Sequence, residues 1–137
     1  MVRTGISHPL PIREVACSEG AIGMTYCPGK IGSSVFGEPW QRDQKTDLNA
    51  LAQWGARAVI TLMDDGELAD LGAGELGAAV EAFGLEWHHL PIPDEDIPGA
   101  SFERRWIYSG HRIRALLRSG EKVAIHCRGD GSRLYGC

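Results

Sequence analysis

The clearest indication of the fold is a short apolar stretch at residues 58–63, which reads AVITLM. A run of this length that is almost wholly apolar and partly β-branched is typical of a strand covered on both faces. The next strand is expected at residues 85–92, closed by Pro93, and a second buried-strand run lies at residues 122–125. Strands covered on both faces occur mainly in parallel sheets, so these runs predict a sheet of that kind.

Helical patterns separate these runs. A helix is expected over residues 43–54, and two short helices are expected around residues 67–71 and 75–83. The longest helix is expected to begin at the N-cap Ser101 and to end near residues 119–120. Its apolar residues at helical spacing are Phe102, Trp106, Ile113 and Leu117. The alternation of strand and helix predicts an α/β fold, a mainly parallel sheet flanked by helices.

The N-terminal part of the chain carries weaker signals. The first twenty residues read as an extended lead-in, and residues 21–26 read as a short strand. A loop rich in glycine and serine is expected at residues 29–39. Farther along, glycines are placed to end helices, at Gly55, Gly72 and Gly84.

Length and charge restrict the class of protein. The 137 residues fit one domain, and 14 Lys+Arg against 18 Asp+Glu give a net charge of −4. This balance provides no general attraction to nucleic acid or to anionic lipid, so we expect neither as a partner. No apolar run approaches the roughly 20 residues that span a bilayer, and the N-terminus lacks a signal-peptide pattern. A cytoplasmic protein is expected.

The four cysteines are far apart and form no C-x-x-C pair, which favours reduced thiols over disulfides. A zinc site built from Cys17, Cys27 and the pair His88-His89 is disfavoured because none of these has the spacing of a ligand loop. The two histidines alternate across a strand, which favours packed or hydrogen-bonded roles. A zinc ion is therefore not expected.

Two other groups of side chains have simple structural interpretations. The tryptophans at the ends or on the apolar faces of elements are expected in the core: Trp54, Trp87 and Trp106. The arginines spread along the longest helix are expected to form a solvated face: Arg104, Arg105, Arg112, Arg114 and Arg118.

Two loops at the ends of predicted strands carry unusual chemistry. One is acidic and contains Asp94, and the other reads CRGDGSR from Cys127 to Arg133. Backbone N–H groups of a loop wrapped after a strand can form an anion nest, and an arginine fork can grip two phosphoryl oxygens. The same field favours the thiolate of Cys127, a nucleophile toward phosphorus. The residues that would line the site are Arg128, Gly129, Asp130, Gly131 and Ser132.

The Cys-x5-Arg spacing alone is a weak motif, and the alternative is an inert buried Cys127 with a solvated Arg133. The apolar strand and His126 directly before the cysteine make the pattern more specific. The run from Ile125 to Cys127, followed by Gly and Arg, resembles the signature loop of the protein-tyrosine and dual-specificity phosphatases.

Other stretches narrow this resemblance to the kinase-associated-phosphatase branch and its bacterial relatives. They are residues 23–30, 42–43, 54–56, 59–62 and 87–94. The resemblance implies a cysteine-dependent phosphatase that needs neither metal nor organic cofactor. It implies as substrate a phosphorylated protein or a small phosphate monoester.

The resemblance also implies a role for each site residue. Cys127 would form a phosphocysteine, Arg133 would clamp the phosphoryl oxygens, and His126 would support the loop and the thiolate. Asp94 would be the general acid that protonates the leaving oxygen and then helps activate water. Asp96 is the neighbour that could be mistaken for it.

The sequence departs from the family pattern after the cysteine, where Asp130, Leu134 and Tyr135 replace the usual Gly, Ser or Thr, and Gly. The expectation is an incomplete phosphatase domain over residues 1–137, with the C-terminal helices missing and the strand around Val123 and Ile125 exposed. Impaired activity follows from that expectation. The alternatives are a non-catalytic phosphate-binding pseudophosphatase or inactive product, and sulfur transfer by a rhodanese-like loop, which usually holds four residues between Cys and Arg.

Overall fold

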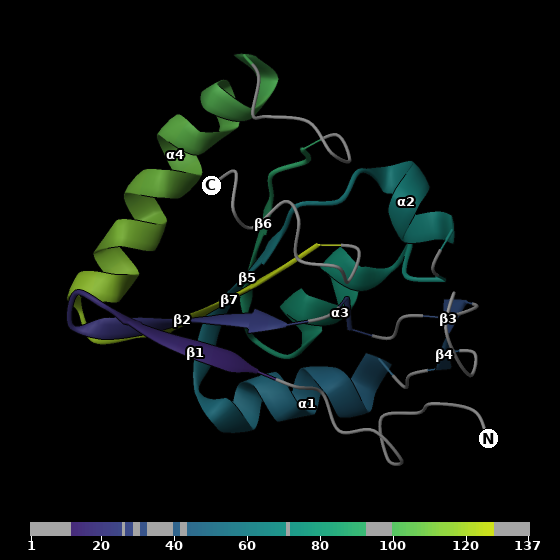
Figure 1. Ribbon diagram of the computed structural model, residues 1–137, viewed down its shortest axis with the longest axis horizontal. Coiled ribbons are helices and arrows are strands. Elements are labelled where there is room, and N and C mark those ends of the chain that lie inside the picture. The colour runs from purple at the N-terminus through teal and green to yellow at the C-terminus, as the bar shows by residue number, and fades with distance from the viewer. Residues whose placement is uncertain are drawn as a thin grey trace.

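The computed structural model describes residues 12–25, 27–28, 31–32, 40–41, 44–70, 72–92 and 100–127. Strands and helices alternate along this part of the chain, as Figure 1 shows. The strands are β1 (Arg13–Cys17), β2 (Gly20–Thr25), β3 (Ile31–Gly32), β4 (Trp40–Gln41), β5 (Ala56–Thr61), β6 (Glu86–His89) and β7 (Lys122–His126). The helices are α1 (Gln44–Trp54), α2 (Asp65–Asp70), α3 (Leu76–Ala82) and α4 (Ala100–Arg118).

The central sheet has the order β1-β2-β7-β5-β6. Strands β2, β7, β5 and β6 run parallel, and β1 pairs antiparallel with β2 at one edge. A separate antiparallel pair joins β3 and β4. The predicted α/β fold with a mainly parallel sheet flanked by helices is confirmed. The last described strand, β7, is inserted between β2 and β5, which places residues 122–126 at the centre of the sheet.

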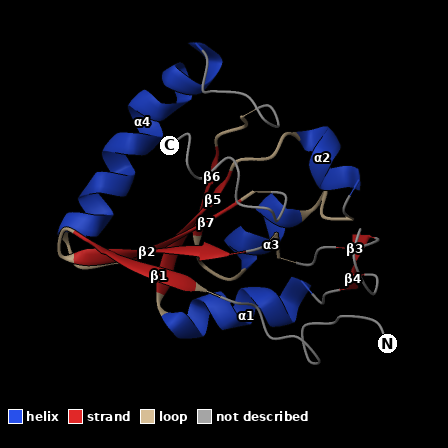
Figure 2. Cartoon of the chain, in the orientation of Figure 1, coloured by secondary structure: helices blue, strands red, loops and turns tan. Residues whose placement is uncertain are grey.

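Helices α1 and α3 cover one face of the sheet (Figure 2). Leu48 and Leu51 of α1 and Leu76 and Val80 of α3 are fully buried against Val59 of β5. Trp54 and Trp87 pack against the same core while remaining partly exposed. This face therefore holds the core that the apolar run at residues 58–63 predicts.

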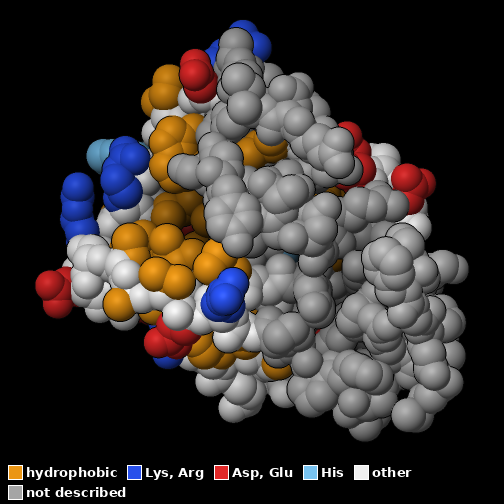
Figure 3. Space-filling view, in the orientation of Figure 1, with side chains coloured by type: hydrophobic (Ala, Val, Ile, Leu, Met, Phe, Trp, Pro, Cys, Tyr) orange, Lys and Arg blue, Asp and Glu red, His pale blue; other side chains and the backbone are white. Residues whose placement is uncertain are grey.

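Helix α4 covers the other face. Its Ile113, Leu116 and Leu117 pack with Ile60 of β5 and Val123 of β7. Hydrophobic side chains gather between α4 and the β1–β2 hairpin on the side seen in Figure 3. The expectation of an exposed strand was wrong for Val123, which has no exposed surface because α4 lies over it. Ile125 is half-buried.

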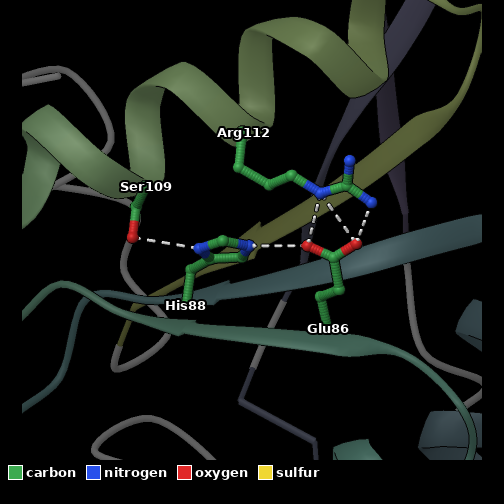
Figure 4. A network of polar contacts seen from close by, with 4 residues as sticks. All are labelled: Glu86, His88, Ser109 and Arg112. Carbon is green, nitrogen blue, oxygen red and sulfur yellow. Dashed lines mark hydrogen bonds and ion pairs between the residues drawn. The ribbon is translucent and has the colours of Figure 1, made fainter.

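A polar network fastens α4 to the edge strand β6 (Figure 4). Arg112 donates two-pronged hydrogen bonds to the Glu86 carboxylate, with Nε 3.0 Å from both oxygens. Glu86 Oε1 also lies 3.2 Å from His88 Nε2, and His88 Nδ1 lies 3.0 Å from Ser109 Oγ. The hydrogen bond from Arg112 lowers the pKa of Glu86 from its usual 4.5. Arg112 is nevertheless exposed, as are Arg104, Arg105, Arg114 and Arg118, so the predicted solvated arginine face is confirmed.

The predicted helices and strands lie within a few residues of the observed ones. Gly55 ends α1 with φ of +109° and donates to the Leu51 carbonyl, as its C-cap placement predicts. The N-cap prediction at Ser101 was wrong because α4 already begins at Ala100. Trp106 was expected in the core but is 36% exposed, because its ring lies across Gly110 on the surface of α4. The extended lead-in includes a complete edge strand, β1.

Candidate active site

The carboxyl ends of the parallel strands meet in one row. The register pairs Thr25 of β2 with His126 of β7, and His126 with Thr61 of β5. Thr61 pairs in turn with His89 of β6. Neighbouring strands in a sheet are roughly 5 Å apart, so these side chains are close together across the edge where α/β proteins bind ligands.

His126, like Thr61 in this row, has no exposed surface. Burial lowers its pKa from 6.5 to about 4, the backbone of Cys127 opposes this, and the nearby charge of His89 lowers it further. Its Nε2 atom lies 2.8 Å from Thr61 Oγ1, and its Nδ1 atom lies 3.4 Å from the carbonyl oxygen of Cys127. At neutral pH the imidazole is therefore uncharged and hydrogen-bonded on both sides.

Cys127 follows β7 directly and is 1% exposed. It is a free thiol that packs in the α4-side core with Leu62 and Leu90. The N–H of Leu62 donates to the His126 carbonyl at 3.1 Å, which extends the ladder between β5 and β7 by one residue beyond the strands. This bond fixes the point at which the Cys127 loop leaves the sheet.

The segment before the acidic loop ends at the same edge. The N–H of Ile92 donates to the Leu62 carbonyl at 3.0 Å, and Ile92 is 1% exposed. Leu62 thus bonds both neighbouring segments: its N–H donates to the His126 carbonyl, and its carbonyl accepts from the N–H of Ile92. Asp94 follows Ile92 by two positions in the sequence and lies outside the described residues, as do Asp96 and the rest of the predicted phosphate loop. That loop comprises Arg128, Gly129, Asp130, Gly131, Ser132 and Arg133.

Within the described part of the chain, no three His, Cys, Asp or Glu side chains are grouped so that they could hold a metal ion. His88 contacts Ser109 and Glu86, whereas His89 Nε2 donates to the Met63 carbonyl at 2.6 Å. The prediction of packed, hydrogen-bonded histidines on opposite sides of β6 is confirmed.

Comparison with known proteins gives the family. Residues 34–135 match the family described as "Polymorphic toxin system, DSP-PTPase phosphatase" (Tc-R-P). This chain belongs to that DSP-PTPase family. The match includes the acidic loop and the Cys-x5-Arg stretch, and it supports the resemblance seen in the sequence.

Two curated relatives of this DSP-PTPase chain are cyclin-dependent kinase inhibitor 3 of Mus musculus and of Rattus norvegicus. Each is 28% identical over 126 residues, which cover 90% of this chain and 54% of the relative. The chain thus spans about half the length of the curated relatives it matches. A crystal structure of kinase associated phosphatase (KAP), with its catalytic cysteine substituted by serine, has a TM-score of 0.78. That match is 21% identical, covers 92% of this chain and 68% of the other, and shows the same fold.

Among the described helices of this DSP-PTPase chain, none is both long and apolar enough to cross a membrane.

The sequence interpretation missed Thr61 and Trp87, whose polar atoms join the row at the carboxyl edge. The available signal was weak: Thr61 is the polar residue in the otherwise apolar run at residues 58–63.

Proposed function

We propose that this chain is a cysteine-dependent phosphatase that hydrolyses phosphate monoesters through Cys127. The observation that carries the proposal is the position of Cys127, which follows the central strand β7 at the carboxyl edge of the sheet in a chain of the DSP-PTPase family. Ile92, which precedes the acidic stretch in the sequence, is bonded at the same edge to Leu62, the residue that also bonds His126. This supports an acid and a nucleophile acting on one substrate.

The proposed reaction has two displacements at phosphorus. The Cys127 thiolate attacks, a P–S bond forms, and the ester P–O bond breaks as Asp94 gives its proton to the leaving oxygen. Water then attacks phosphorus, the P–S bond breaks, and Asp94 takes a proton from the water. Inorganic phosphate and the free thiolate are the products.

The remaining residues of the loop would stabilise the charge on the phosphoryl group. Arg133 would donate to two phosphoryl oxygens, and the backbone N–H groups of residues 128–132 would surround the others. Such donors are worth most when they are fixed before the reaction, and losing one can cost about 10²–10³ in rate. A metal ion is not needed for this chemistry.

The proposed substrate is a phosphorylated protein, with a small phosphate monoester as the simplest model of it. Phosphotyrosine, phosphoserine and phosphothreonine peptides, assayed at equal concentration, identify the class. Hydrolysis of phosphotyrosine together with one of the other two would assign dual specificity.

The decisive experiment compares Cys127 with Cys27, which is equally buried at 0% exposed. Limited alkylation with iodoacetate at neutral pH, followed by mass mapping, should label Cys127 first because the proposed anion-binding site around it favours its thiolate. Cys127→Ser should abolish hydrolysis of an aryl phosphate, whereas Cys27→Ser should leave it unchanged. Equal labelling of both cysteines, with activity that survives Cys127→Ser, would refute the proposal.

The acid is tested separately. Asp94→Asn should slow an alkyl phosphate, whose leaving group needs a proton, about 10²–10⁴-fold, and should slow an aryl phosphate much less. Asp96→Asn is the matched control and should affect neither substrate. A larger effect at Asp96 would assign the acid to that residue.

A non-catalytic phosphate-binding protein is the second candidate, favoured by Leu134 where the family usually has a hydroxyl residue after the arginine. It predicts selective protection of Cys127 from iodoacetate by vanadate or phosphate without turnover of any phosphate ester. Turnover lost in Cys127→Ser excludes it.

A further inference from the structure

A chain of hydrogen bonds crosses three strands and ends at the backbone of the proposed nucleophile. Trp87 Nε1 of β6 donates to Thr61 Oγ1 of β5 at 2.8 Å. Thr61 Oγ1 lies 2.8 Å from His126 Nε2 of β7, and His126 Nδ1 lies 3.4 Å from the Cys127 carbonyl oxygen. Thr61 and His126 have no exposed surface, so water cannot replace these partners.

The direction of each hydrogen bond follows from what each group can donate. The Cys127 carbonyl only accepts, so His126 carries its proton on Nδ1. Because burial keeps the ring neutral, Nε2 of His126 is then an acceptor and receives the Thr61 hydroxyl proton. The Thr61 oxygen in turn accepts the Trp87 indole proton. All the donors therefore point the same way, from Trp87 toward Cys127.

The Trp87 indole, at the start of this series of hydrogen bonds, is held rigidly. The Trp87 ring packs against Gly77 of α3 so closely that a methyl group at position 77 would overlap it. The His89 ring is stacked against it at 4.8 Å between centroids. His89 is itself tied to the Met63 carbonyl. Packing and hydrogen bonding thus fix the indole N–H before it meets Thr61.

We infer that Thr61 and Trp87 are positioning residues for Cys127, acting through His126. This inference rests on the proposed function of Cys127. Along the polypeptide, the carbonyl of Cys127 is the backbone acceptor closest to the thiol. Its oxygen carries a partial negative charge, which would repel a phosphoryl dianion. When Thr61 holds the His126 ring in place, the hydrogen bond from Nδ1 keeps the Cys127 carbonyl turned toward the protein interior. His89 is an ionisable residue close to His126, and its charge opposes protonation of His126.

Two variants at one position separate the hydroxyl from the shape of the side chain. Thr61→Val keeps the shape and removes the donor, whereas Thr61→Ser keeps the donor. We expect Thr61→Val to lower kcat for an aryl phosphate about 10-fold to 100-fold with KM within about twofold. The pH midpoint of Cys127 alkylation by iodoacetate should rise by about one unit. Thr61→Ser should restore both to within about threefold of the parent.

The indole is tested with a matched control. Trp87→Phe removes the N–H that reaches Thr61 and should move kcat and the alkylation midpoint in the same direction as Thr61→Val. Trp54→Phe removes an indole N–H on the same face that donates to Glu14 at 2.6 Å, away from Cys127, and should change neither. Comparing Trp87→Phe with Trp54→Phe tests the positioning role even if Thr61→Val fails to fold.

The outcomes distinguish this inference from the proposed function. In the first outcome, the parent protein shows selective alkylation of Cys127 and turnover that depends on Cys127, and neither changes in Thr61→Val or Trp87→Phe. This outcome overturns the inference and leaves the proposed function standing. A parent in which Cys127 is neither preferentially alkylated nor needed for turnover overturns both. Variants that lose only thermal stability, with kcat and the alkylation profile intact, reduce Thr61 to a structural role and overturn the inference.

Discussion

The neutral, buried state of His126 predicts a loss of stability on mild acidification. Its pKa is about 4 in the folded protein against 6.5 for the exposed group. The folded pKa lies below the unfolded one, so the stabilisation is complete above pH 6.5. Below that pH the unfolded chain takes up a proton that the folded protein refuses, and the free energy of unfolding falls.

The size of the effect follows from the shift. At about 1.4 kcal/mol per unit, the full difference is roughly 3 kcal/mol, of which about 2–2.5 kcal/mol is lost between pH 7 and pH 4.5. Domains of this size have roughly 5–15 kcal/mol in total, so the loss is a large fraction. The pKa values of Glu14 and Glu86 are lowered from 4.5, so their contributions are lost mainly below this window.

Urea unfolding at several pH values between 7 and 4.5, followed by tryptophan fluorescence, measures the slope. The parent midpoint should fall by about 1–2 M urea over this range. His126→Asn keeps a donor near the Nδ1 position but cannot titrate, so its slope should be nearly flat whatever its absolute stability. His111→Asn, at an exposed position on α4, is the matched control and should keep the parent slope. A flat parent profile, or equal slopes in the parent and His126→Asn, would refute the reasoning.

Two further predictions concern packing and polar contacts. Gly77→Ala should cost about 1–3 kcal/mol because its methyl group would overlap the Trp87 ring, whereas Gly74→Ala, with open space around it, should cost nothing in urea unfolding. Ser109→Ala should cost about 1–3 kcal/mol because it leaves a buried histidine nitrogen without its partner, whereas Ser119→Ala at an exposed position should be neutral in thermal unfolding.

The fold could be predicted because its determinants are local. The apolar runs identify β5 and β7, Pro93 marks the end of the segment that holds β6, and a glycine such as Gly55 ends a helix where the backbone turns to positive φ. The edge strand β1 could be seen only as extended chain, since its sequence, REVAC, lacks the alternation of apolar and polar residues that marks a half-buried strand, and four of its five residues are exposed. Trp106 was misplaced because an aromatic residue at helical spacing can cover its own helix as readily as the core.

The contacts around His126 could not be predicted because they depend on the order of strands. Thr61 and His126 are 65 positions apart, and they meet only because β7 pairs with β5 after the chain has passed through β6 and α4. The sequence places Thr61 within one strand and His126 directly after another. It does not indicate which strand ends are neighbours.

The alternation of a β-strand explains how one segment can supply both a dry support and a nucleophile. Successive residues point to opposite faces, so His126 follows Ala124 into the core beneath α1 and α3, while Cys127 joins the cluster beneath α4. The histidine can therefore be neutral and fully bonded while the next residue begins the loop. A one-residue shift of β7 against β5 would exchange the two faces and bury the thiol against Thr61. The ladder bond from Leu62 to the His126 carbonyl, directly beside the exit of the loop, opposes that shift and so preserves the site.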